Sequence, residues 1–223
     1  MTYEFHYGIV LSRFDELLLG AWLTIQLTAM SVAIGLPLAT LFAYILVWGN
    51  RWPRRCIVFY VELIRNTPFL VQIFFIFFGL PSLGIKLTSN EAALVAMVVN
   101  VTAYATEIMR TGFEEVPAGQ QEAGFALGLR RPGVFFLIIF RPALKVIFPA
   151  LASQFVMLLL GSSVVSGIAA ADLTAMANTI NTQTFRSFEV YSIVLFLYLG
   201  LAIVFRTLFR TVYVLAFERR GKW

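Results

Sequence analysis

The sequence is poor in charged residues and has one cysteine and one histidine. Only 13% of its 223 residues are charged and 60% are hydrophobic, whereas soluble domains carry about 25% charged residues. This composition argues against an ordinary soluble domain and indicates a membrane protein. Because Cys56 is the only cysteine and His6 the only histidine, we expect no internal disulfide, no metal site and no serine-hydrolase triad.

The sequence also lacks the marks of two functional classes that a basic chain could suggest. Its net charge is +5, but no Lys/Arg stripe lies on a polar domain, so we expect cationic ends facing anionic membrane lipid and no nucleic-acid binding. Neither of its two G-x4-G glycine pairs is followed by Lys-Ser or Lys-Thr, so the phosphate-binding loop of an ATPase is missing. Nor do its apolar segments carry the chain of carboxylates that a proton relay needs. We therefore expect a non-enzymatic subunit of a larger system.

Five apolar segments approach or exceed the length of about 20 residues that spans a bilayer. They cover residues 17–48, 57–80, 91–109, 146–165 and 190–217. The first ten residues lack a basic region, so we interpret the first segment as a span and not as a cleaved signal. The sequence predicts an all-α membrane protein with five transmembrane helices in one domain, residues 1–223.

The distribution of Lys and Arg predicts the orientation of these spans. With the N-terminus outside, 14 of the 17 basic residues fall on or towards the inner side, and only Arg13, Lys86 and Arg186 lie outside. Because cytoplasmic loops carry the Lys/Arg excess, we expect a periplasmic N-terminus and a cytoplasmic C-terminus. Trp22, and Trp48 with Trp52, are then expected near the two membrane interfaces.

Polar residues line single faces of three spans. In the third span, Asn100, Tyr104, Glu107 and Thr111 recur at helical spacing, which indicates a water-facing or bundle-facing stripe. An alternative places Glu107 at the inner interface, where a carboxylate costs little. In the first span a stripe of small residues predicts close helix packing, and Pro37 predicts a kink. This stripe comprises Gly20, Thr24, Thr28, Ser31 and Gly35.

The second span begins with the polar segment "ELIRNTPFLVQ". Glu62 and Arg65 are spaced i, i+3 and could form an ion pair. Pro68 is expected to disturb the helix just after them, and Gln72 follows one turn later. This group would serve either as a gate or as a structural device that fixes the tilt of the helix.

The stretch "GQQEAGFALGLRRPG", Gly119–Gly133, interrupts the apolar chain between the third and fourth spans. We expect a short cytoplasmic helix preceded by Pro117 and Gly119, with Glu122 in its first turn, where the helix dipole favours a carboxylate. Gly128 would end the helix and Pro132 would prevent a simple continuation. Such a helix could dock into a groove on a partner protein, or it could lie along the membrane surface.

The same stretch resembles a known family. Glu122-Ala123-Gly124, Gly128 and Ile138 match the EAA motif of ABC importer permeases at its spacing. "YVELIRNTPFLVQIFFIFFGLP" and "AYATEIMRTGFEEVPAGQQEAG" resemble segments of the polar amino-acid subgroup, and the resemblance covers Leu17 to Phe217. It implies the type I importer permease fold, with a coupling loop over residues 112–133.

The resemblance also implies partners. These are a cytoplasmic ABC ATPase dimer that binds ATP and Mg, a second permease subunit, a periplasmic amino-acid-binding protein, and a polar amino acid as substrate. The implied location is the bacterial inner membrane. The expected roles are ATPase coupling by Gln121, Glu122, Ala123, Gly124, Leu127 and Gly128; a substrate pathway through Gln72, Asn100, Tyr104, Gln154, Ser162 and Ser163; and structural or gating roles for Glu62, Arg65, Pro68 and Glu107.

The sequence departs from the family pattern at three places. Gly124 replaces an alanine, which is expected to loosen the helix by up to ~1 kcal/mol. Phe140-Arg141 replaces Leu-Pro, with the proline displaced to Pro142. In the fourth span, Leu160 and Gly161 stand where the subgroup has Lys-Asp, so we expect a non-identical partner permease to supply the charges. Two rival hypotheses remain: an ion-driven carrier or channel that needs no ATPase, and a membrane scaffold whose polar stripes would tolerate Asn100→Leu.

Overall fold

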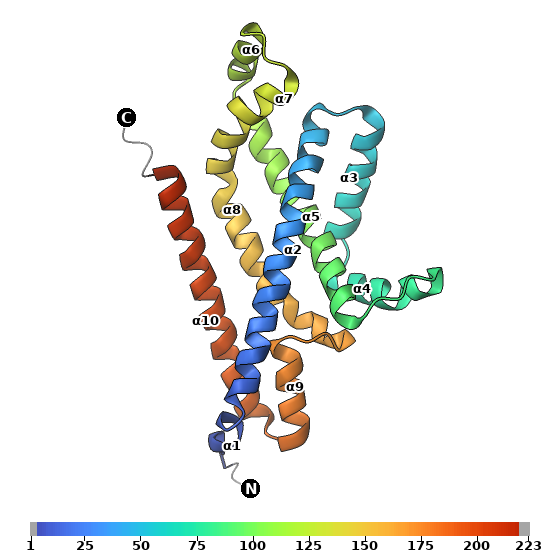
Figure 1. Cartoon of the computed structure of the whole chain (residues 1–223), viewed down its shortest axis with the longest axis vertical. Helices are drawn as coiled ribbons and strands as arrows, with labels where there is room; N and C mark the ends of the chain where they lie inside the picture. Colours follow the sequence, from blue (N-terminus) through green and yellow to red (C-terminus); the bar gives the residue numbers. More distant parts are fainter. Residues whose placement is uncertain (1–3, 219–223) are drawn as a thin grey trace.

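The structure, a computed structural model, describes residues 4–218, which form helices and connecting turns without a strand. Long helices run the length of the molecule (Figure 1). The α-helices in chain order are α1 (Tyr7–Leu11), α2 (Phe14–Trp48), α3 (Arg51–Arg65), α4 (Phe69–Phe74), α5 (Ser89–Glu114), α6 (Ala118–Ala126), α7 (Arg131–Val134), α8 (Phe140–Gly161), α9 (Leu173–Thr184) and α10 (Ser187–Tyr213). The 3-10 and π segments are η1 (Phe75–Gly79), η2 (Leu80–Leu83), η3 (Phe135–Ile139), η4 (Ser162–Ile168) and η5 (Val214–Glu218).

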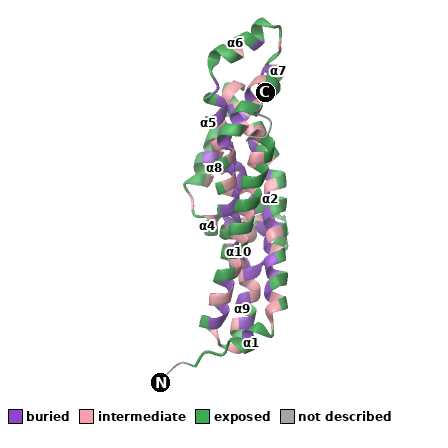
Figure 2. Ribbon diagram, turned by 90° about the vertical axis from the view of Figure 1, so that its left-hand side faces the viewer, coloured by how far each residue is buried: buried purple, intermediate pink, exposed green. Residues whose placement is uncertain are grey.

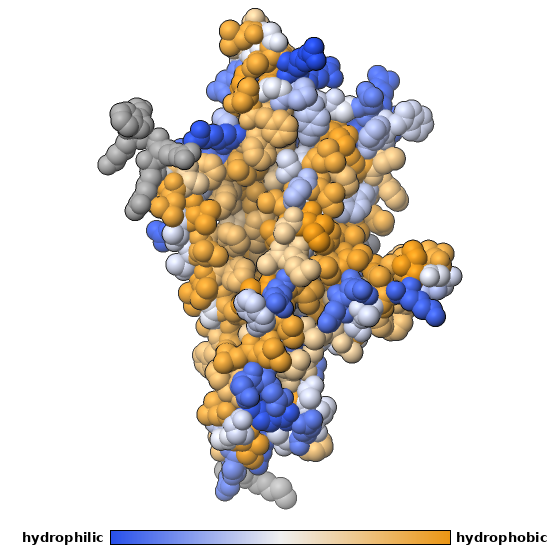
Figure 3. Space-filling view, viewed as in Figure 1, coloured by the Kyte–Doolittle hydropathy of each residue, from blue (hydrophilic) through white to orange (hydrophobic). Residues whose placement is uncertain are grey.

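Four helical segments of the described chain are long and apolar enough to cross a membrane. They cover Phe14–Trp48, Ser89–Glu114, Arg131–Ile168 and Ser187–Phe217. These segments confirm four of the five predicted spans, at 17–48, 91–109, 146–165 and 190–217. The apolar side chains that the structure leaves exposed along them, such as Leu195 and Phe196, suit contact with lipid tails (Figure 3).

The remaining predicted span, residues 57–80, is broken near Pro68, where the sequence predicted a disturbance of the helix. Helix α3 ends at Arg65, and the helical segment Phe69–Leu83 leaves it at an angle of 111°. Pro68 has no N–H to continue the helix and disfavours helical dihedrals at Thr67. The pair is therefore a broken span or a re-entrant segment, a sharper break than the sequence pattern predicted.

Helix α2 packs along α5 and α9 through its stripe of small residues, as the sequence predicted. All five stripe residues are buried. A Cβ atom at Gly35 would overlap the side chain of Val101 on α5, and one at Gly20 would lie 2.8 Å from the Cα atom of Leu173 on α9. Glycine at these two positions therefore lets the helix backbones approach closely. Helix α2 continues without interruption through Pro37.

The two ends of the molecule carry different short helices. Helices α6 and α7 project beyond one end, and α1 and α9 lie at the other (Figures 1 and 2). Asp172 caps the start of α9, and its carboxylate accepts a hydrogen bond of 2.7 Å from the backbone N–H of Ala175. Burial raises the pKa of this carboxyl above its ordinary value. By the predicted orientation, the α6 end is cytoplasmic.

Candidate functional site

Gln72 joins the two parts of the broken span to α5. It is buried, and its Nε2 atom donates hydrogen bonds to the carbonyl oxygens of Ile64, at 2.7 Å, and Thr67, at 3.0 Å. Ile64 is in the last turn of α3, where the helix leaves its C=O groups without partners, and Thr67 lies just beyond the helix. The Oε1 atom of Gln72 accepts a hydrogen bond of 3.2 Å from Nδ2 of Asn100. Gln72 therefore holds the break in place and orients Asn100.

Asn100 opens onto a pocket of about 220 Å³ between the broken span, α5 and α8. Three of the residues predicted for the substrate pathway, Asn100, Tyr104 and Gln154, line this pocket together. The other lining residues are Thr67, Phe69, Met157, Leu158 and Gly161. Amide, hydroxyl and apolar groups thus surround a space without a formally charged residue in its wall.

The remaining predicted pathway residues lie elsewhere. Gln72 supports the pocket through Asn100 but does not line it. Ser162 is fully buried and donates a hydrogen bond of 2.7 Å to the carbonyl of Leu159, while Ser163 donates one of 2.9 Å to the carbonyl of Leu160. The two serines therefore satisfy the backbone at the end of α8 and are not in the pocket wall.

Of the residues at which the sequence departs from the family pattern, Gly161 lines the pocket. A Cβ atom at this position would meet nothing within 4 Å. An aspartate here, as in the polar amino-acid subgroup, would therefore have room for its side chain. Glycine leaves the pocket wall neutral.

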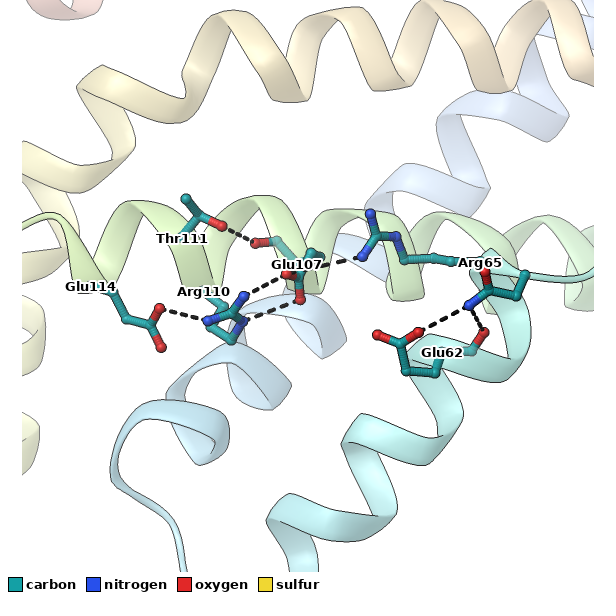
Figure 4. A network of polar contacts seen from close by, with 7 residues as sticks. Glu62, Arg65, Glu107, Arg110, Thr111 and Glu114 are labelled. Atoms are coloured by element: carbon teal, nitrogen blue, oxygen red, sulfur yellow. Dashed lines mark hydrogen bonds and ion pairs between the residues drawn. The ribbon is translucent and has the colours of Figure 1, made fainter.

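A network of charged side chains extends along α5 from the pocket towards α6 (Figure 4). Arg110 donates to both carboxylate oxygens of Glu107, at 3.2 and 2.5 Å, and to Glu114 at 2.6 Å. The guanidinium of Arg65 lies 4.0 Å from Glu107 and 5.7 Å from the ring centre of Tyr104. Arg65 thus connects the network to a residue that lines the pocket.

The ion pair that the i, i+3 spacing allowed between Glu62 and Arg65 does not form. Glu62 instead accepts a hydrogen bond of 2.9 Å from Nδ2 of Asn66 at the end of α3, and Arg65 turns towards Glu107 on α5. The i, i+3 spacing made the pair possible, but the close approach of α3 to α5 offers Arg65 a carboxylate and an aromatic ring. Arg110 and Glu114, which the sequence analysis did not assign to a site, complete the network.

Helix α6 contains the motif residues Gln121, Glu122, Ala123 and Gly124. Two details of the predicted helix are wrong, because it begins directly after Pro117. Gly119 therefore lies within the helix, and Glu122 is in its second turn and not its first. The predicted end is confirmed: Leu127 caps the helix and Gly128 has a φ of +79°, a left-handed conformation that glycine adopts readily.

One face of α6 packs on its own chain and the other is exposed. Gly124 is buried, and a Cβ atom there would overlap Cδ1 of Ile138 and lie 3.1 Å from Cγ2 of Val134. Gln121 donates a long hydrogen bond of 3.5 Å to the carbonyl of Val116. Glu122 and Ala123 are exposed, and Leu127 is 82% exposed.

Sequence reasoning missed several residues of these two regions. Thr67, Phe69, Met157 and Leu158 line the pocket because the break in the span and the pitch of α8 turn them inward. Their types resemble ordinary span residues, so nothing in the pattern marked them. Among residues 4–218 no group of three or more His, Cys, Asp or Glu side chains could hold a metal ion.

Comparison with known proteins gives consistent results. Residues 35–220 match the family described as "binding-protein-dependent transport system inner membrane component". The chain is 36% identical over 164 residues to an L-cystine transport system permease protein of Bacillus subtilis, covering 74% of this chain and 70% of that protein. It is 29% identical over 221 residues to a glutamine transport system permease protein of Escherichia coli, covering 98% and 99% of the two chains.

Solved structures show a similar fold. A crystal structure of an amino acid ABC transporter with histidines contains a chain that matches with a TM-score of 0.85 and 32% identity, over 99% of this chain and 100% of that one. A structure of the MetNI methionine ABC transporter matches with a TM-score of 0.73 over 91% and 96% of the two chains. At 19% identity, this second match concerns the fold alone.

Proposed function

Because this chain belongs to the family of binding-protein-dependent transport system inner membrane components, and is by homology the permease component of an amino-acid ABC importer, we propose that it moves polar amino acids inward with energy from a separate ATPase. ATP and Mg would be bound by a cytoplasmic ABC ATPase dimer, and the substrate would arrive on a periplasmic amino-acid-binding protein. The chain itself would supply the membrane path and the coupling helix.

The observation that carries this proposal is the exposed face of α6. The helix projects past the ends of α5 and α8 (Figure 1), with Glu122, Ala123 and Leu127 exposed on it. An apolar side chain as exposed as Leu127, beside a carboxylate on a short projecting helix, suits a groove on a partner better than water. Because Gly124 anchors the opposite face against Ile138 and Val134, a push on α6 would pass directly to α7 and η3, which continue into α8.

The substrate path is proposed to run through the pocket of Asn100, Tyr104 and Gln154. Their amide and hydroxyl groups can donate and accept hydrogen bonds, as the two ends of an amino acid require. Arg65, which lies over the ring of Tyr104, is a cation beside the pocket that could attract the carboxylate of a passing substrate. Arg110 donates to both Glu107 and Glu114, whereas Arg65 only approaches Glu107, at 4.0 Å, so its guanidinium could still donate to a substrate.

A second permease subunit, non-identical to this one, is part of the proposal. The neutral wall at Gly161 lacks the charge that the subgroup places there. A partner chain that retains Lys-Asp at the matching positions would supply it across the shared path.

The proposal is tested by purifying the chain with its co-expressed ATPase. We expect Glu122→Lys and Gly128→Asp to reduce the amount of ATPase retained, because the first reverses a charge on the exposed face and the second strains a left-handed residue. Asp15→Lys is the control, since Asp15 is an exposed carboxylate at the start of α2, at the opposite end of the molecule. Full retention of the ATPase by both α6 variants would contradict the docking role.

A further inference from the structure

A second pocket, of about 250 Å³, lies between α8 and α10 and is unrelated to the proposed substrate path. Its α10 wall contains Arg206, Arg210 and Tyr213, and its α8 wall contains Phe148, Ala152 and Val156. It shares no lining residue with the pocket of Asn100, Tyr104 and Gln154. The two pockets open on different faces of α8.

The two arginines of this second pocket lack acidic partners among the described side chains. Arg206 and Arg210 are one helical turn apart, and neither forms an ion pair with another side chain of residues 4–217. The pocket lining contains no Asp or Glu. Two arginines and a tyrosine that line one pocket suit an oxygen-rich anion such as a phosphate.

The rest of the pocket and the surface below it are apolar. Phe148 and Val156 belong to its wall, and Ile203 and Leu199 continue along α10 as exposed side chains. Ile203 lies about 10 Å from Arg210 along the helix axis. Of the spans, α10 is the one least covered by the rest of the chain, with 17% of its most apolar window buried, and the surface over α8 and α10 is mostly hydrophobic in Figure 3.

We propose that this pocket binds a phospholipid with an anionic headgroup from the cytoplasmic leaflet. The headgroup phosphate lies against Arg206 and Arg210 in the pocket that Tyr213 also lines, and an acyl chain runs past Val156 along the exposed Ile203 and Leu199 towards the membrane interior. Helix α10 presents two arginines and then exposed apolar side chains, an order that fits one molecule with an anionic head and an apolar tail. A bound lipid of this kind fills the gap between α10 and α8 and fixes the position of α10. The inference needs only that the chain lies in a membrane, so it does not depend on the coupling role of α6.

The test measures lipid bound to the protein, purified together with its neighbours, in nanodiscs that contain either phosphatidylglycerol or only phosphatidylcholine. We expect the wild type to retain phosphatidylglycerol selectively in native mass spectrometry. Arg206→Gln with Arg210→Gln should lower that preference about thirtyfold, roughly fivefold for each arginine. Ala152→Trp should lower it with both arginines intact, because the indole fills the apolar part of the pocket.

Controls separate this site from general charge attraction. Arg51→Gln with Arg54→Gln removes the same charge from the exposed start of α3 and should leave the preference unchanged. If the glutamine pair fails to fold, Arg206→Lys with Arg210→Lys replaces it. This pair keeps the positive charge and should retain much of the phosphatidylglycerol binding. The proposal would be overturned if the α3 and α10 variants lost the same amount of phosphatidylglycerol preference. It would also be overturned if inorganic phosphate bound the protein as well as phosphatidylglycerol does.

Discussion

Asn100 on α5 donates a hydrogen bond of 3.2 Å to the side-chain oxygen of Gln72, across the break in the second span. The amide of Gln72 in turn holds the last carbonyls of α3. One hydrogen-bonded chain therefore connects the broken span to the pocket where the substrate is proposed to pass.

Asn100→Leu tests this connection. Leucine removes the donor to Gln72 and a polar group from the pocket, and an unsatisfied buried oxygen costs about 1–3 kcal/mol. We expect uptake to fall roughly tenfold while the chain still inserts into the membrane. Transport assays in vesicles measure this, with Val95→Leu, on an exposed position of the same helix, as the control. Unchanged uptake in Asn100→Leu would favour a scaffold role.

Gly161→Asp tests the neutral wall of the pocket. The structure leaves open space at this position, so the variant should fold, and its carboxylate should shift selectivity towards cationic amino acids and away from anionic ones. Competition between labelled and unlabelled amino acids measures the order of preference. Gly161→Ala, which adds a side chain without charge, should leave that order unchanged. If Gly161→Asp also leaves it unchanged, the pocket is not on the substrate path.

Gly124→Val tests the anchoring of α6. A branched side chain would collide with Ile138 and Val134, so we expect α6 to shift and ATPase retention to fall severalfold. Gly124→Ala should be mild, because the end of the Ile138 side chain can rotate and alanine favours the helix by about 1 kcal/mol over glycine. Gly119→Val is the matched control on the same helix, since nothing lies within 4 Å of a Cβ atom there. Equal retention in the two valine variants would show that the Gly124 contact does not position α6.

The sequence predicted the parts of the fold that depend on composition and periodicity. Four apolar segments of sufficient length became helices that can span a membrane, and the small residues at Gly20 and Gly35 became close helix contacts. The position of the break at Pro68 was predicted, but the angle between the two helical segments was not. At this break of 111°, Gln72 donates hydrogen bonds to the carbonyls of Ile64 and Thr67, which a continuous helix would have satisfied through its own backbone.

The contacts between helices could not be predicted from spacing along one helix. Arg65 had a possible partner one turn away in Glu62, yet it lies near Glu107 because α3 packs against α5. Ser162 and Ser163 were polar residues at membrane depth, but their hydroxyls bond to the backbone of their own helix. Asn100, Tyr104 and Gln154 do meet in one pocket, while their role in transport remains a prediction. The packing reason for Gly124 also required Ile138 to be placed beside it.

The measurement that tests the central claim most directly is uptake in proteoliposomes, with this chain, its partner permease and the binding protein present and the ATPase either included or omitted. We predict amino-acid uptake that requires both the ATPase and ATP, and that continues when ion gradients are collapsed. Uptake by the chain without an ATPase, driven by an ion gradient, would contradict the account and favour a secondary carrier.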